Sequence, residues 1–220
     1  MPSHVDEYAS EKIVVKFEGE RCIHSRNCVL GNPQVFVPNA TGAWIQPGAA
    51  SVEEIVQLAH ACPSGAISYQ RNDGGVPETA PKVNALRIRE NGPLAITAEL
   101  HIEGEALRYR ATLCRCGASQ AKPFCDGSHN GNDSATRFIA SGEPPAAEKV
   151  AILPAKDGPL KVTPKPDGPL HVQGNLEICS GTGRTVQRSV EAWLCRCGNS
   201  SNKPFCDGTH RKSGFKAPGV

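Results

Sequence analysis

Short apolar or alternating runs, separated by glycine and proline, dominate this chain. In the first seventy-five residues, three runs have the character of β-strands, and they lie at residues 12–19, 41–48 and 65–70. Residues 51–62 (SVEEIVQLAHAC) instead repeat apolar positions with a helical period, and Ser51 with Glu54 forms a capping box. This part is therefore predicted as β, helical turn, β, helix, β.

The rest of the chain is predicted to be mostly β. Four further runs are β-branched or weakly alternating, and they lie at residues 94–102, 108–113, 171–178 and 185–194. Gly92-Pro93 and Gly168-Pro169 mark turns ahead of two of them. With the one clear helix at 51–62, the whole chain is predicted to be α+β.

Composition limits the expected cellular location of the protein and the kinds of partner it is expected to bind. The 220 residues carry a net charge of +2 with interleaved signs, which gives no broad basic patch for nucleic acid. The N-terminus lacks a basic segment followed by an apolar one, and no run of 18 apolar residues exists, so neither secretion nor a membrane span is expected. We expect a cytoplasmic protein, in which the ten cysteines are metal ligands rather than disulfides.

One cysteine motif occurs twice. CRCGASQAKPFCDGSH at 114–129 and CRCGNSSNKPFCDGTH at 195–210 share the spacing C-x-C-x8-C-x3-H. The candidate ligands are Cys114, Cys116, Cys125 and His129, and then Cys195, Cys197, Cys206 and His210. Similarity extends upstream, so the duplication covers roughly residues 85–138 and 159–215.

The donor set indicates metal chemistry rather than catalysis by the protein. Three thiolates and one imidazole suit either zinc or an iron–sulfur cluster. Structural zinc sites usually pair their ligands as C-x2–4-C, so C-x-C is less typical, but zinc stays open as an alternative. No substrate pocket, general base or phosphate loop is recognisable, and we therefore expect a protein that is not an enzyme.

The repeated motif resembles the CDGSH iron–sulfur family, the mitoNEET-like proteins, and differs only by Thr209 in the second copy. The resemblance implies one [2Fe–2S] cluster in each motif, with the C-x-C cysteines on the inner iron and the third cysteine and the histidine on the outer one. Members of that family commonly dimerise by exchanging strands. Two motifs in one chain therefore imply an intrachain pseudo-dimer and a monomeric protein.

Local features of the motif allow more specific expectations. Gly117 and Gly198 lie where the chain must curl so that both C-x-C thiolates face one centre. Asp126 is a preferred N-cap and is expected to start a short helix near the outer ligands. Arg115 and Arg196, between the paired cysteines, are expected to balance cluster charge.

The N-terminal cysteines form a separate set. Cys22, Cys28 and Cys62 follow the pattern C-x5-C…C-P, which over residues 12–72 resembles single-cluster bacterial ferredoxins. Ser25 replaces the middle cysteine of that family. Three cysteines suit a [3Fe–4S] cluster, whereas His24 as a fourth ligand would complete a [4Fe–4S] cluster. A site that is empty or filled with zinc remains a further alternative.

These features combine into one organisation and one leading function. We expect a ferredoxin-like domain at residues 1–75 and two β-rich CDGSH modules at 84–140 and 158–220, joined by linkers at 71–82 and 140–158. The predicted function is electron transfer with redox partner proteins such as a reductase. Cluster storage, transfer to an acceptor, and redox or pH sensing form the alternative, and a zinc-stapled interaction module is a third possibility.

Overall fold

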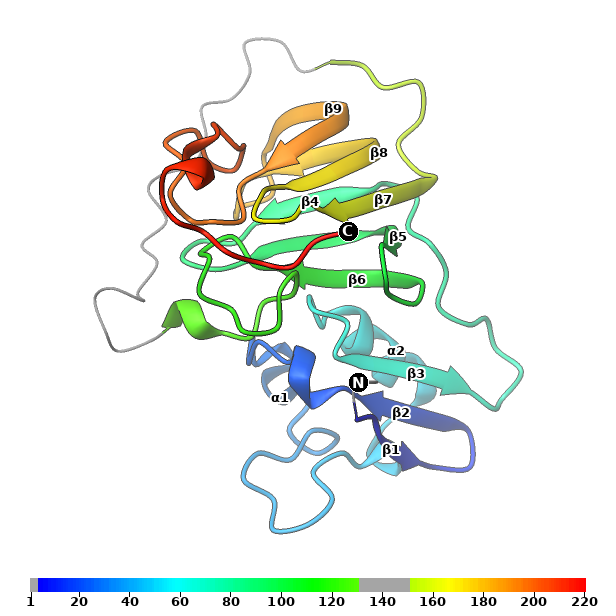
Figure 1. Ribbon diagram of the computed structural model, residues 1–220. Coiled ribbons are helices and arrows are strands. Elements are labelled where there is room, and N and C mark those ends of the chain that lie inside the picture. The colour runs from blue at the N-terminus through cyan, green and yellow to red at the C-terminus, as the bar shows by residue number, and fades with distance from the viewer. Residues whose placement is uncertain (1–3, 131–150) are drawn as a thin grey trace. The chain divides into compact units, whose positions relative to one another are not determined.

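The computed structural model describes residues 4–130 and 151–220, and the chain divides into two compact units, Met1–Thr79 and Ala80–Val220 (Figure 1). Residues 131–140 of the expected first module and 140–150 of the expected linker lie outside the described residues. In the described part of the chain, no helix combines the length and the apolar character needed to cross a membrane.

The first unit is a three-stranded antiparallel sheet with two helices. Its strands, in spatial order, are β1 (Asp6–Ala9), β2 (Ile13–Phe17) and β3 (Ile67–Arg71). Its helices are α1 (Asn27–Gly31) and α2 (Val52–His60), with 3-10 turns at Gly19–Arg21 and Pro47–Ala49. The runs at 12–19 and 65–70 correspond to β2 and β3, whereas β1 was not predicted.

The strand expected at 41–48 is wrong. Phe36 and Ile45 form only an isolated antiparallel bridge, flanked by hydrogen bonds from Val37 N to Trp44 O and from Gln46 N to Val35 O, both of 2.8 Å. Pro47 has no N–H with which to extend a ladder, and it begins a 3-10 turn instead. Tertiary pairing therefore stops after one bridge.

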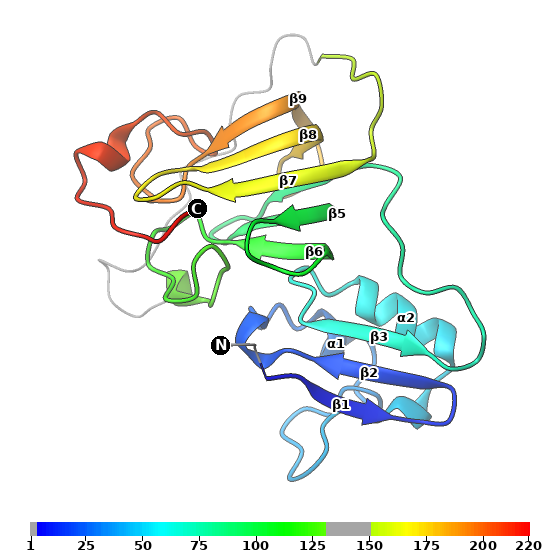
Figure 2. The same ribbon diagram turned by 45° about the vertical axis from the view of Figure 1, so that its right-hand side comes forward.

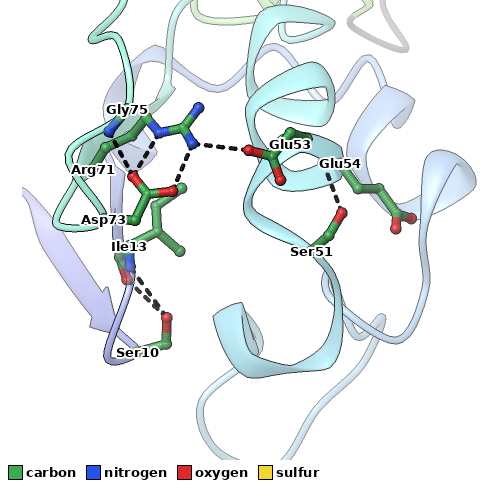
Figure 3. A network of polar contacts seen from close by, with 8 residues as sticks. All are labelled: Ser10, Ile13, Ser51, Glu53, Glu54, Arg71, Asp73 and Gly75. Carbon is green, nitrogen blue, oxygen red and sulfur yellow. Dashed lines mark hydrogen bonds and ion pairs between the residues drawn. The ribbon is translucent and has the colours of Figure 1, made fainter.

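Helix α2 is capped at its start and linked by an ion pair to the end of β3 (Figure 3). Ser51 Oγ accepts a hydrogen bond of 3.3 Å from Glu54 N, as the capping box predicts. Arg71, at the end of β3, donates to Glu53 of α2 over 2.9 Å and to Asp73 over 2.6 Å. The Arg71 guanidinium holds the pKa of the Asp73 carboxyl well below its usual range.

The second unit contains both copies of the repeat in one six-stranded sheet. The strands are β4 (Ala85–Ile88), β5 (Leu94–Ile102), β6 (Arg108–Leu113), β7 (Pro159–Pro164), β8 (Leu170–Cys179) and β9 (Thr185–Leu194). Each copy thus contributes three consecutive strands. The runs predicted at 94–102, 108–113 and 185–194 coincide with β5, β6 and β9.

The two copies pair crosswise. Strand β4 is antiparallel to β5 of its own copy and parallel to β8 of the other copy. Strand β7 repeats this relation, antiparallel to β8 and parallel to β5. Leu86 consequently faces Ile96 on one side and Ile178 on the other. The first strand of each copy is therefore shared between the copies.

The core of this unit is also shared. Leu86, Ile96 and Leu100 of the first copy and Leu160 and Ile178 of the second are fully buried in one cluster. Burying such a side chain stabilises a fold by about 1.5–3 kcal/mol. Strands β6 and β9 leave this core at the same end of the sheet, and both motif loops begin there (Figures 1 and 2).

Candidate metal centres

Each cysteine motif folds back onto the strand that precedes it. Cys114 directly follows β6, and its N–H donates to Pro123 O over 2.8 Å, while Cys125 N donates to Thr112 O over 2.9 Å. In the second copy, the equivalent bonds run from Cys195 N to Pro204 O and from Cys206 N to Trp193 O, each of 2.8 Å. The third cysteine is therefore fixed beside the first by main-chain bonds in both copies.

The ligands predicted from the motif form two pairs in each copy. Cys114 Sγ and Cys116 Sγ lie 3.7 Å apart, and Cys125 Sγ lies 3.5 Å from His129 Nδ1. The second copy repeats both pairs. Its separations are 3.8 Å for Cys195–Cys197 and 3.3 Å for Cys206–His210.

Backbone amides point at the sulfur atoms. Ala118 N donates to Cys116 Sγ and Gly127 N donates to Cys125 Sγ, each over 3.4 Å. Asn199 N and Gly208 N make the same contacts, also of 3.4 Å, with Cys197 and Cys206. Hydrogen bonds of this kind favour thiolate over thiol, and they tune the potential of a bound cluster.

The thiols of the first C-x-C pair are within hydrogen-bond distance of one another. A hydrogen bond from Cys116 lowers the pKa of Cys114 to about 6, whereas the pKa of Cys116 is raised because it donates that bond and is buried. Burial also raises the pKa of Cys125 to about 11. Three thiolates together are therefore unfavourable without a cation, and metal coordination deprotonates such thiols.

The histidines are positioned by one-turn 3-10 helices at Ser128–Asn130 and Thr209–Arg211. The expectation that the motif aspartate caps a helix is only partly right. Asp126 Oδ1 accepts from Ser128 N over 3.0 Å, and Asp207 Oδ1 accepts from Thr209 N over 3.0 Å, but the N-cap of the second turn is Gly208. The aspartates close an Asx turn one residue earlier.

The two glycines of the C-x-C-G segments lie where the copies touch. Gly117 and Gly198 have φ angles of +85° and +80°, which favour glycine. A Cβ on Gly117 would lie 2.6 Å from Cys197 O, and one on Gly198 would lie 2.3 Å from Cys116 O. The curl predicted at these glycines is confirmed, and it also brings the two inner cysteine pairs back to back.

The three N-terminal cysteines line one cavity of about 520 Å³ in the first unit. Cys22 follows the first 3-10 turn, Cys28 lies in α1, and Cys62 lies just after α2. Burial raises the pKa of Cys22 and of Cys28, and the charge of Cys62 adds to both shifts. Burial favours the neutral form of Cys22 and Cys28, which is unreactive towards solvent, and a bound metal would deprotonate them.

His24 and Ser25 line the same cavity. His24 has a left-handed backbone with a φ of +52°, and its Nδ1 lies 3.9 Å from Cys22 Sγ. Left-handed backbone is uncommon at residues other than glycine, although histidine adopts it more often than most. The structure thus brings both candidate fourth ligands to the cavity.

The grouping of the candidate ligands can be compared with what zinc and a two-iron cluster each require. Within residues 4–130 and 151–220, no three His, Cys, Asp or Glu side chains converge on the position of one metal ion. Tetrahedral zinc requires four donors around a single point, whereas a two-iron cluster takes one pair of ligands on each iron. Within each pair, separations of 3.3 to 3.8 Å suit two ligands of one metal atom.

The sequence did not predict the cleft beside the second centre. Cys206 and His210 line an open cleft of about 930 Å³ together with Trp193 and Phe215. Trp193 is 43% exposed, although its carbonyl holds Cys206. No signal in the sequence marked this cleft, because the exposure of Trp193 follows only from the fold. Large aromatic side chains exposed to water often mark contact surfaces.

Comparisons with known proteins agree with this geometry. Residues 91–130 and 167–211 match the family described as an iron-binding zinc finger of CDGSH type, and residues 8–72 match a divergent 4Fe-4S mono-cluster family. The uncharacterized protein YjdI of Escherichia coli K12 is 41% identical over 63 residues, which cover 29% of this chain and 82% of YjdI. YjdI of strain O157:H7 gives the same values.

The two family matches therefore identify an iron–sulfur protein, and its structure is mixed and mostly β. The chain belongs to the CDGSH-type iron-binding proteins, and it carries a divergent 4Fe-4S mono-cluster domain ahead of its two CDGSH motifs.

Proposed function

We propose that this protein transfers electrons through three iron–sulfur clusters. The two motifs each hold one [2Fe–2S] cluster, the first through Cys114, Cys116, Cys125 and His129 and the second through Cys195, Cys197, Cys206 and His210. Such clusters, when bound, accept and give up one electron each. The observation that carries this proposal is the repeated arrangement of two ligand pairs, with sulfur separations of 3.7 and 3.8 Å in the C-x-C pairs.

In the first unit, Cys22, Cys28 and Cys62 hold the third cluster, with His24 as the fourth ligand of a [4Fe–4S] centre. The shared cavity and the position of His24 beside Cys22 support this ligand set. The match of this region to a 4Fe-4S family supports four irons over three. This unit is then a ferredoxin-like domain that receives electrons from a reductase.

The second unit acts as an intrachain pseudo-dimer of CDGSH modules. The crosswise pairing of β4 with β8 and of β7 with β5 supports this, because each copy completes the sheet of the other. The protein in this proposal is a monomer that meets its redox partners transiently in the cytoplasm.

The test is composition and spectroscopy of the full chain. Protein purified without oxygen should contain iron and acid-labile sulfide, with little zinc, and should give reversible electron paramagnetic resonance signals of two [2Fe–2S] centres and one [4Fe–4S] centre. A colourless protein with zinc and no sulfide, after expression with ample iron, would contradict it.

Cluster transfer is the second candidate, favoured by the cleft at Cys206 and His210. Both outer ligands are partly exposed there, which gives an acceptor access to the second centre. Mixing the holo-protein with an apo-ferredoxin distinguishes the two functions. Fast handover of the intact cluster would favour transfer, whereas reversible reduction with all clusters retained would favour electron transfer.

A further inference from the structure

The middle residue of each C-x-C pair is a buried arginine. Arg196 is 1% exposed and Arg115 is 4% exposed. A buried guanidinium is unfavourable unless an anion compensates its charge, because arginine cannot lose its proton in a protein. The location of the compensating anion is therefore informative.

Backbone carbonyls satisfy the donors of Arg196 without neutralising it. Its guanidinium donates to Gly168 O over 2.9 Å, to Lys165 O over 2.5 Å and to Pro218 O over 2.9 Å. In the described part of the chain, no carboxylate makes a hydrogen bond or an ion pair with this side chain. Asp167, which is nearby, instead accepts hydrogen bonds from Lys216 and from Ala217 N.

Two contacts place Arg196 at the junction with the first motif. Arg196 Cζ lies 5.5 Å from the centroid of the Phe215 ring. Lys122 Nζ, which belongs to the first motif, lies 5.9 Å from the same centroid. Two residues after Arg196, the backbone of Gly198 lies against Cys116. The segment that carries Arg196 thus packs against the segment that carries the first C-x-C pair.

The influences on the pKa of each arginine also come from the opposite motif. Burial lowers the pKa of Arg196, and the Cys114 thiolate of the first motif is the largest opposing influence. Burial lowers the pKa of Arg115 to about 10, and the largest opposing influence is Cys195 of the second motif. In each case a cysteine of the opposite motif offsets part of the effect of burial, ahead of Asp167 for Arg196 and ahead of Cys116 for Arg115.

We propose that each of these arginines is the counter-charge of the opposite motif's centre, so that Arg196 sets the reduction potential of the centre at Cys114–His129. Arg115 does the same for the centre at Cys195–His210. The inference rests on the proposed function, because the anion is the thiolate-bound cluster. A fixed cation stabilises the reduced centre, which carries one more negative charge, and so raises its potential.

The test uses the full-length holo-protein with its first centre marked by His129→Cys, which changes that centre's visible and paramagnetic spectra. In this background, Arg196→Gln should lower the reduced-to-oxidised ratio of the first centre about tenfold at a given potential, a shift of about 59 mV. The second centre should shift less. Arg196→Lys should retain most of the potential because it keeps the charge.

Arg188→Gln is the matched control, because it removes a cation of the same unit that is paired with Glu177 over 2.7 Å. It should leave both potentials unchanged.

The reciprocal variant Arg115→Gln, with His210→Cys as the mark, should lower mainly the reduction potential of the second centre. It tests the inference if Arg196→Gln does not fold. Equal shifts at both centres, a larger shift at the arginine's own centre, or no shift would overturn the inference. Absence of acid-labile sulfide in the parent protein would instead contradict the proposed function.

Discussion

Gly117 lies so close to Cys197 that a Cβ on the glycine would be 2.6 Å from the cysteine's carbonyl oxygen. The reciprocal contact of Gly198 with Cys116 is as tight, at 2.3 Å. The inner ligand loops of the two motifs therefore pack through bare backbone. Any side chain added at this junction would disturb both centres at once.

Gly117→Ala should destabilise the second unit strongly. We expect the free energy of unfolding to fall by about 3 kcal/mol, because positive-φ strain and overpacking each cost about 1–3 kcal/mol. Gly104→Ala is the control, since Gly104 has a similar φ of +86° but open space around it, and it should cost only about 1 kcal/mol. Denaturant unfolding followed by circular dichroism measures both. Equal losses would show that the contact with Cys197 does not matter.

Acid should release the CDGSH centres. Burial, followed by the charge of Arg115, lowers the pKa of His129, so the unfolded state binds more protons than the folded state between the two pKa values. The free energy of unfolding then rises with pH and falls on acidification through this window. Neutral imidazole is also the form that binds metal, so both effects have the same sign.

We therefore expect the visible absorbance to be lost as the pH falls below about 6.5, the usual histidine pKa. The His129→Cys, His210→Cys double variant should keep its absorbance to a lower pH, since no imidazole is left to protonate at either centre. Absorbance recorded during slow acidification provides the measurement. An unchanged midpoint in the double variant would exclude the histidines as the cause.

His24 and Ser25 can be separated as ligands of the third cluster. His24→Ala should convert the [4Fe–4S] signal of the first unit into a [3Fe–4S] signal, because one iron loses its protein ligand. Ser25→Ala, the matched neighbour in the same cavity, should leave the signal unchanged. Low-temperature paramagnetic resonance distinguishes the two cluster types. The opposite pattern would assign the ligand to Ser25.

Ser51→Ala should weaken the first unit alone. It removes the hydroxyl that accepts from Glu54 N, and loss of such an N-cap costs about 0.5–2 kcal/mol. Ser51→Asp should restore most of the loss, because aspartate caps equally well. Calorimetry of the holo-protein measures the change. A loss of the same size in Ser51→Asp would indicate that the hydroxyl does something other than capping.

Local elements were largely predictable from the sequence. The capping box at Ser51 gave the start of α2, and alternation gave β5, β6 and β9. Strand β1 was not predicted because its sequence, DEYA, has little apolar alternation. It forms through pairing with β2. Pairing partners are not local properties, which is why 41–48 was overestimated as a strand.

The candidate ligands could be found because their spacing is unusual and occurs twice. The burial of Arg115 and Arg196 could not be predicted, because charged residues are usually exposed and only the folded structure shows that these two are buried. The cleft at Trp193 likewise depends on the C-terminal residues that border it, which the motif does not specify.

Because β4 and β7 are shared within one chain, the association of the two repeats does not depend on protein concentration. When two separate chains exchange strands, dilution separates them. Here the exchange is between segments of one polypeptide, so their effective concentration is fixed by the connecting chain and not by how much protein the cell makes. Both repeats should therefore stay associated even in a scarcely expressed protein.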